Sequence, residues 1–215
     1  MATPHTDDIE KILRERISRH EILPGTKLRE RPLTEEFNVS RARIRQAFAF
    51  LEQRGLIERI PNQGAIVSKL KASELFEIYD VFELLEGLCV RLAVQKSHPT
   101  SWDDLAEIFG EELDFAVAEG DCETLFKAIM VYRSRVREAA KNPTLDTFLD
   151  SIYDKTQAII QRTLILPGRA ELSLKEHRDI IAAMRQGQAE KAEELKLNNM
   201  RSARQFLERY HVFLL

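Results

Sequence analysis

The sequence predicts a mainly α-helical protein in two parts, a small N-terminal part with two short strands and a larger part built only of helices. Residues 40–56 carry apolar side chains at helical spacing, and two short apolar runs with a turn between them follow at 56–60 and 65–67. From residue 73 onward only helical periodicity is found, interrupted at short intervals by Pro and Gly. The 215 residues and the hydrophobic content of 44% are sufficient for one large or two modest domains.

The N-terminal elements follow from the order of apolar and turn-forming residues. Asp7 to about His20 is expected to be a helix, and residues 33–39 a second, short helix that ends in a turn at Asn38. Ser40 is the expected N-cap of the helix at 40–56. With the strands at 56–60 and 65–67, this order predicts a winged helix-turn-helix.

Three arginines, Arg41, Arg43 and Arg45, lie in the first turns of the helix at 40–56. A run of arginines on a helix is most often a solvated face. Cations at a helix N-terminus oppose the helix dipole, however, so these three indicate a phosphate or base-edge partner. Residues 1–70 hold 13 Lys and Arg against 10 Asp and Glu, and the remaining residues hold 19 against 25. A basic N-terminal part therefore precedes an acidic body.

About forty residues of the N-terminal part carry the motifs of a known family: Pro24-Gly25, Leu28, Glu30, Leu33, Val39-Ser40-Arg41, Arg45, Leu51, Gly55-Leu56-Ile57, Pro61-Asn62, Gly64 and Val67. By these motifs the chain resembles the GntR family of bacterial transcription regulators. The resemblance implies that four residues approach the DNA operator, namely Arg31, Arg41, Arg45 and Gly64. We expect Ser40, Arg43 and Gln63 to join them. The family's usual Thr-Pro is replaced by Ala42-Arg43, and Arg43 either adds a phosphate contact or changes the base preference.

Residues 71–215 are predicted to form an all-α bundle of six or seven helices, as a second domain after residues 1–70. Ser73 is the expected N-cap of its first helix. The predicted helices are Ser73 to Lys96, Ser101 to Glu119, Cys122 to Lys141, Thr144 to Leu166, Leu172 to Gln186, and Ala189 to Tyr210 or beyond.

Several short motifs recur in order along this helical part: Leu84-Leu85-Glu86-Gly87, Arg91-Leu92-Ala93, Ala118-Glu119-Gly120-Asp121, Glu176-His177 and Gly187-Gln188-Ala189. Their order and spacing resemble the FadR-type ligand-binding domain of GntR regulators, from Ser73 to about Arg204. The resemblance implies that this domain binds an effector and dimerises. Most members of that subfamily hold a divalent metal through one aspartate and three histidines. The matching positions here are Ile129, Arg133, His177 and Asn199.

Only His177 of these four positions retains a metal ligand, and the guanidinium of Arg133 would repel a divalent ion. We therefore predict no metal and no cofactor. Arg133, His177 and Asn199 are instead expected to bind a small anionic organic effector, with Ile129 and Phe82 as apolar wall. Phe82 stands where the family commonly has arginine. Two alternatives remain: His177 hydrogen-bonds within its own helix, and Arg133 pairs with a buried glutamate.

These features predict a homodimeric, cytoplasmic transcriptional repressor that binds a palindromic double-stranded DNA operator under the control of an organic-acid or acyl-type effector. An enzyme is not predicted, because His177 lacks a catalytic partner. Cys89 and Cys122 provide neither a disulfide framework nor metal-ligand spacing, which indicates a reducing compartment. No run approaches the roughly twenty apolar residues that span a membrane. The alternative is an architectural DNA-binding protein with a vestigial, ligand-free helical domain.

Overall fold

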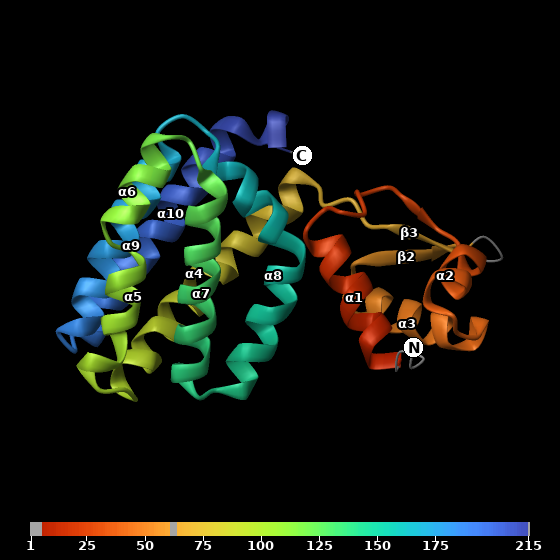
Figure 1. Cartoon of the computed structure of the whole chain (residues 1–215), viewed down its shortest axis with the longest axis horizontal. Helices are drawn as coiled ribbons and strands as arrows, with labels where there is room; N and C mark the ends of the chain where they lie inside the picture. Colours follow the sequence, from red (N-terminus) through yellow and green to blue (C-terminus); the bar gives the residue numbers. More distant parts are fainter. Residues whose placement is uncertain (1–5, 61–63, 215) are drawn as a thin grey trace. The chain divides into compact units, whose positions relative to one another are not determined.

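The computed structural model describes residues 6–60 and 64–214. The chain divides into two compact units (Figure 1). Unit 1 comprises Met1–Lys71 with Ser151–Ala158, and unit 2 comprises Ala72–Asp150 with Ile159–Leu215. Among the described residues, no helix combines the length and apolar character needed to cross a membrane.

Unit 1 contains the predicted winged helix-turn-helix. Its helices are α1 (Thr6–Ser18), α2 (Glu30–Phe37) and α3 (Arg41–Gln53), and its strands are β1 (Lys27–Leu28), β2 (Ile57–Ile60) and β3 (Gly64–Val67). The sheet is antiparallel, in the order β1-β3-β2. Apolar side chains from all three helices and the sheet form one core beneath α3. The core therefore fixes α3 through its apolar face and leaves its arginine-bearing turns at the surface.

The boundaries of α2 and α3 have local causes. Asn38 ends α2 in the left-handed conformation, with φ 52°, and the Ser40 side chain accepts from the backbone N–H of Arg43 at 3.4 Å. Both the turn at Asn38 and the Ser40 cap are thus confirmed. The helix α2 begins at Glu30, three residues before the predicted start. Pro32 lies in its first turn, where the N–H that proline lacks would have no helical partner.

Gly64 allows the wing to pair closely with the short strand β1, which was not predicted from the sequence. Its φ is +95°, and a Cβ at this position would lie 2.3 Å from the backbone oxygen of Leu28. Only glycine tolerates both the positive φ and the close approach of the Leu28 backbone oxygen. Leu28 pairs with Ala65, the residue after Gly64. Gly64 therefore has a structural role whether or not its backbone approaches DNA.

Unit 2 is all-helical, as predicted. Its elements are α4 (Ala72–Gln95), the 3₁₀ turn η1 (Pro99–Trp102), α5 (Asp103–Ile108), α6 (Glu111–Ala118), α7 (Cys122–Ala140), α8 (Pro143–Leu164), α9 (Arg169–Arg185) and α10 (Ala189–Leu214). The helix α8 contributes its middle residues to unit 1. The helix α4 packs against α7 and α10, and α10 also packs against α9 (Figure 1). These four helices bring together the residues considered for effector binding.

Two predictions for this part were wrong. The single helix expected from Ser101 to Glu119 is divided into η1, α5 and α6, with a break at Phe109 and Gly110. Arg178 stabilises the break, because its guanidinium donates to the backbone oxygens of Phe109 and Gly110 at 2.7 and 2.8 Å. Ser73 is not an N-cap, since α4 already begins at Ala72.

Candidate functional site

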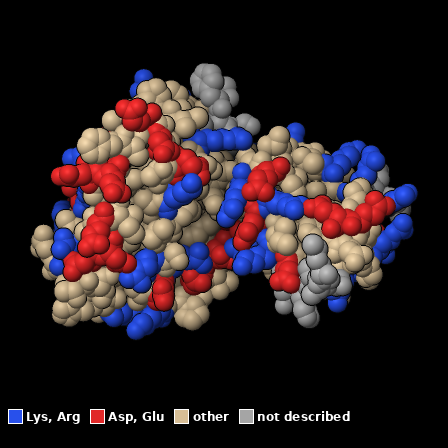
Figure 2. Space-filling view, in the orientation of Figure 1, with Lys and Arg blue, Asp and Glu red and all other residues tan. Residues whose placement is uncertain are grey.

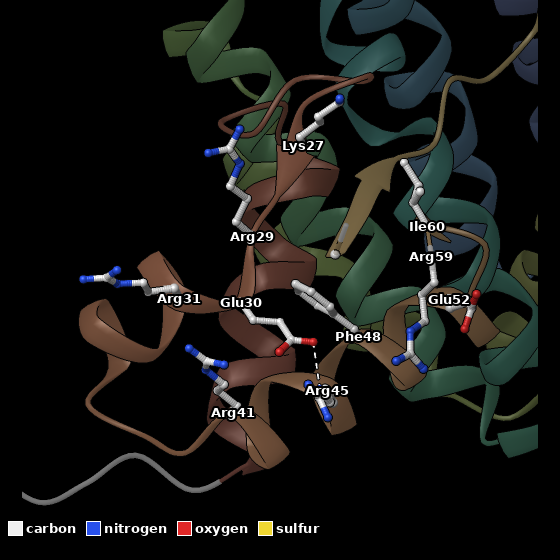
Figure 3. A pocket seen from close by; sticks show the side chains of 11 residues that line it. Lys27, Arg29, Glu30, Arg31, Arg41, Arg45, Phe48, Glu52, Arg59 and Ile60 are labelled. Carbon is white, nitrogen blue, oxygen red and sulfur yellow. Dashed lines mark hydrogen bonds and ion pairs between the residues drawn. The ribbon is translucent and has the colours of Figure 1, made fainter. Parts of the chain in front are cut away.

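A basic hollow of about 960 Å³ opens in unit 1, lined by residues of α2, α3 and the three strands (Figure 3). Its lining contains two carboxylates, Glu30 and Glu52. Six cations face them: Lys27, Arg29, Arg31, Arg41, Arg45 and Arg59. In Figure 2, Lys and Arg side chains gather at the right-hand end of unit 1, beside a band of Asp and Glu, and unit 2 carries patches of both charges. The excess of positive charge suits the hollow to a polyanion.

The structure brings most of the predicted DNA-contacting residues to this surface. Ser40 caps α3 and Arg43 lies in its first turn, and neither belongs to the lining of the hollow. Gln63 lies outside the described residues. The predicted residues that line the hollow are Arg31, Arg41, Arg45 and Gly64.

Two of these residues are held by ion pairs within unit 1. The Arg45 Nε donates to Glu30 Oε1 at 2.8 Å (Figure 3), and Arg31 Nε donates to Glu35 Oε1 at 3.0 Å. The hydrogen bond from Arg45 lowers the pKa of the Glu30 carboxyl. Arg41 makes no ion pair in the part of the chain that the structure describes, and its guanidinium is available to an incoming phosphate.

Three cations of the hollow, Lys27, Arg29 and Arg59, were not predicted from the sequence. Lys27 belongs to β1, Arg29 is the N-cap of α2, and Arg59 lies on β2 (Figure 3). Strand alternation would not have found Arg59, because it puts this residue on the same face as the buried Ile57, whereas the structure leaves Arg59 exposed. Lys27 carried no signal either, since β1 has only two residues.

Unit 2 contains a buried network of charged and polar side chains. The Lys196 Nζ lies 2.9 Å from Glu86 Oε2 and donates to Asn199 Oδ1 at 3.2 Å. Arg133 Nε lies 3.9 Å from the other carboxylate oxygen of Glu86. Each of these four residues is at most 7% exposed. Arg133 and Asn199 therefore belong to one network, joined through Glu86 and Lys196.

A second arm of the same network starts at Asn199. Its Nδ2 donates to Glu176 Oε2 at 2.7 Å, and Arg169 Nη1 donates to that oxygen at 2.9 Å. Arg169 is 3% exposed, and its Nη1 also lies 3.4 Å from the Ser202 hydroxyl. We call the members of both arms, together with the aromatic and imidazole rings beside them, the buried cluster: Glu86, Tyr132, Arg133, Arg169, Glu176, His177, Lys196 and Asn199.

His177 lies beside Tyr132 in this cluster and is neutral. Burial and, after it, the positive charge of Lys196 lower its pKa to about 3. Its Nδ1 donates to the backbone oxygen of Ser173 at 2.8 Å, so Nε2 carries the lone pair. Its ring stacks on Phe109 with centroids 5.4 Å apart and meets the edge of Tyr132 at 5.2 Å. The hydrogen bond within its own helix, one of the two alternatives from the sequence, is thus present.

The residues at this place do not fit a divalent metal ion. Ile129 and Phe82 are buried and apolar, and the Arg133 guanidinium lies 5.9 Å from the centre of the Phe82 ring. Lys196 adds a second cation beside the carboxylate of Glu86. Across residues 6–60 and 64–214, no group of three His, Cys, Asp or Glu side chains could hold a metal. The other alternative from the sequence, pairing of Arg133 with a buried glutamate, is also observed.

Five members of the buried cluster were not predicted as site residues: Glu86, Tyr132, Arg169, Glu176 and Lys196. A signal existed for Glu86, which follows Phe82 by four positions and shares its buried helix face. Lys196 gave none, because a lysine on an amphipathic helix is ordinarily solvent-facing. Its burial depends on Glu86, which lies on another helix.

Comparisons with known proteins agree with this architecture. Residues 5–67 match the family model described as bacterial regulatory proteins, gntR family, and residues 77–202 match the FCD domain. The chain is 29% identical over 185 residues to the uncharacterized HTH-type transcriptional regulator YdhC of Bacillus subtilis, covering 85% of this chain and 76% of that protein. A shorter match, 39% identical over 72 residues, covers 34% of this chain and 32% of the transcriptional repressor RspR of Escherichia coli.

Solved structures share the whole fold. Escherichia coli McbR/YncC has a TM-score of 0.80 at 21% identity, covering 96% of this chain and 98% of that chain. A GntR regulator from Rhodococcus sp. RHA1 has a TM-score of 0.73 at 20% identity, covering 95% and 98%. The relatives are transcriptional regulators, and a helix-turn-helix precedes an FCD domain here as the two family models describe. The chain belongs to the GntR family of bacterial regulatory proteins, as a DNA-binding transcriptional regulator with a C-terminal FCD domain.

Proposed function

We propose that the chain is a homodimeric cytoplasmic repressor, which binds a palindromic operator and releases it when a small anionic organic effector occupies the helical domain. Residues 1–70 are the DNA-binding domain, and residues 71–215 bind the effector and dimerise. The basic hollow with six cations beside α3 is the observation that carries the DNA-binding proposal. Repression is supported by RspR and by the gluconate operon transcriptional repressor of Bacillus subtilis, which is 27% identical over 164 residues.

In the proposed complex, α3 enters the major groove and its N-terminal arginines, Arg41 and Arg45, meet base edges. The other proposed contacts are to phosphates and to the groove beside the wing: Lys27, Arg29, Arg31, Ser40, Arg43, Arg59, Gln63 and Gly64. Selection of bound duplexes from a randomised pool by the full chain tests this proposal. An enriched inverted repeat is expected, because a two-fold protein binds two half-sites. Enrichment of an asymmetric sequence, or of none, contradicts it.

The surface of α4 supports dimerisation through unit 2. Val81 and Leu84 are 54% and 59% exposed, and Ile78, Leu85 and Leu88 beside them are partly exposed. These positions recur every three or four residues and form one apolar stripe. An exposed stripe of this kind is the feature that an obligate interface buries.

The buried cluster supports effector binding by unit 2. An effector acts through its different affinities for the DNA-competent and DNA-incompetent states. Arg133, His177 and Asn199 are proposed to contact the effector, beside Phe82 and Ile129. A thermal-shift screen of the full chain with organic acids and acyl thioesters tests this. A raised melting temperature, together with release of labelled operator, is expected. No shift with any compound supports the architectural alternative.

A further inference from the structure

One buried carboxylate of unit 1, that of Asp154, comes from α8 rather than from the N-terminal residues. Asp154 belongs to the segment Ser151–Ala158, which the middle of α8 contributes to unit 1. The residue is 6% exposed. A buried carboxylate is costly unless cations or other donors compensate its charge. The partners of Asp154 therefore show what holds this segment of α8 in unit 1.

These partners lie on two different helices of the same unit. Asp154 Oδ1 accepts from Arg14 Nε at 2.6 Å and lies 3.5 Å from the Ser18 hydroxyl, and both residues are on α1. Asp154 Oδ2 accepts from Arg54 Nε at 2.7 Å. Arg54 is the C-cap of α3, 100 positions before Asp154 in the sequence. A single carboxylate of α8 thus holds both α1 and the end of α3.

A second contact between α8 and α3 lies beside the first. Gly55 follows Arg54 directly, and a Cβ at this glycine would lie 3.1 Å from the Nζ of Lys155. Arg54 is also fixed from its own helix, since its guanidinium carbon lies 5.4 Å from the centre of the Phe50 ring. Asp154 and Lys155 are consecutive residues, so both contacts belong to one turn of α8.

The rest of α8, residues 143–150 and 159–164, belongs to unit 2. Because an α-helix is continuously hydrogen-bonded along its length, a shift of its ends is carried to its middle. Resting on the proposed control of DNA binding by unit 2, we propose that Asp154 is the residue through which that control reaches α3. Its carboxylate fixes the C-terminal end of α3 to α8, whereas the arginines proposed to contact DNA lie in the first turns of α3. Asp154 is therefore a positioning residue.

Coupling between two sites is reciprocal, so DNA bound at α3 is expected to act on α8 in return. This reciprocity allows a test that needs no effector. Amide hydrogen exchange of the full chain is measured by mass spectrometry with and without the selected operator. In the wild type, operator binding is expected to change exchange at residues 143–150 and 159–164 by at least about fivefold, the lower end of common couplings. Unchanged exchange at both segments overturns the proposal.

Asp154→Asn keeps the shape of the side chain and removes the charge that Arg14 and Arg54 share. With operator at a concentration that saturates this variant, exchange in the two segments of α8 should no longer respond. Asp146→Asn is the matched control, because Asp146 also lies on α8 but pairs with Arg137 in unit 2. The control should respond as the wild type does. A general loss of stability would lower the melting temperature but would not remove the response of Asp154→Asn alone.

A wild-type response in Asp154→Asn overturns the proposal. Loss of all operator binding in the folded variant also overturns it, because the carboxylate would then serve DNA binding itself rather than its control. Circular dichroism shows whether the variant folds. If it does not, Arg54→Gln replaces it, since Asp154 then keeps Arg14 as a partner at 2.6 Å and loses only its bond to α3. The same loss of response is expected, and a full response overturns the proposal.

The outcomes separate this proposal from the function on which it rests. If the operator changes exchange in other helices of unit 2 but not in α8, the two units are coupled and only the role of Asp154 is wrong. If exchange changes nowhere in unit 2, control of DNA binding by this unit is wrong as well. Operator affinity is measured in a separate titration, so DNA binding by unit 1 is judged independently of either result.

Discussion

The guanidinium of Arg45 on α3 is bound to the carboxylate of Glu30 on α2, with 2.8 Å between Nε and Oε1. This ion pair joins α3, the proposed recognition helix, to α2 within the basic hollow (Figure 3). It uses only Nε, so the terminal Nη atoms remain able to donate to a base edge. Glu30 therefore restricts the orientation of Arg45. If Arg45 contacts DNA as proposed, this restriction lowers the entropy lost on binding.

Arg45→Ala is expected to weaken binding to the selected operator by roughly five- to 150-fold, the range for one base contact. The preference at one position in each half-site should relax, because a base-edge donor is removed. Fluorescence anisotropy titrations on the selected duplex and on a scrambled duplex measure both effects. Unchanged affinity for the selected duplex would contradict the assignment of α3 as the recognition helix.

Glu30→Gln is expected to lower the ratio of specific to non-specific affinity, because Arg45 loses the charge that orients it. Affinity for the scrambled duplex should rise slightly, since a carboxylate facing phosphates is removed. Glu35→Gln is the control, as Glu35 pairs with Arg31 on the exposed side of α2. If Glu30→Gln and Glu35→Gln give the same specificity ratio, Glu30 does not position Arg45.

Arg59→Ala is expected to weaken binding to all duplexes alike, because the proposed contact of Arg59 on β2 is to the DNA backbone rather than to bases. The slope of log affinity against log salt should fall in magnitude by about 0.9, because the variant neutralises one phosphate fewer. Arg43→Ala should behave in the same way if Arg43 contacts a phosphate. Weaker binding to the selected duplex alone would instead assign either arginine to base recognition.

The helix-turn-helix was predictable because its signals are local. Ser40 caps α3, Asn38 ends α2, and the apolar spacing of Ile44 and Phe48 fixes the buried face of α3. The division between α5 and α6 was not predictable. It depends on Arg178, which lies about seventy positions away and binds the free backbone oxygens of the break.

The buried cluster was predictable only in part. The family resemblance located Arg133, His177 and Asn199, and the structure joins Arg133 to Asn199 through a shared network. Lys196 was missed because a lysine on an amphipathic helix is ordinarily solvent-facing. Glu86 was missed although it shares the buried face of α4 with Phe82. Their burial follows from the packing of α10 on α4, which places the two charges 2.9 Å apart.

The apolar stripe on α4 predicts a dimer that a single charge should disrupt. Leu84→Asp in the full chain is expected to give monomers at micromolar concentration, because a carboxylate would be buried without a partner. Phe115→Asp is the control, since Phe115 on α6 is 72% exposed and lies away from the stripe. Sedimentation velocity measures both variants. A dimeric Leu84→Asp protein, or a monomeric wild type, would contradict dimerisation through α4.

Arg133→Ala is expected to abolish release of the operator by the effector while leaving operator affinity without effector unchanged, because only the difference between the two states is removed. Glu86 keeps Lys196 as its partner at 2.9 Å, so unit 2 should still fold, with a lower melting temperature. Arg135→Ala is the control, since Arg135 lies on the same helix, is 42% exposed and pairs with Asp104.

The readout is displacement of labelled operator by whichever carboxylate releases it from the wild type. Full release from the Arg133→Ala protein would show that Arg133 serves only its ion pair with Glu86. Elemental analysis of wild type purified without chelators completes the test. Near-stoichiometric zinc, nickel or manganese would show that His177 binds a metal. The anionic effector would then bind that metal, because the metal would supply the positive charge here attributed to Arg133 and Lys196.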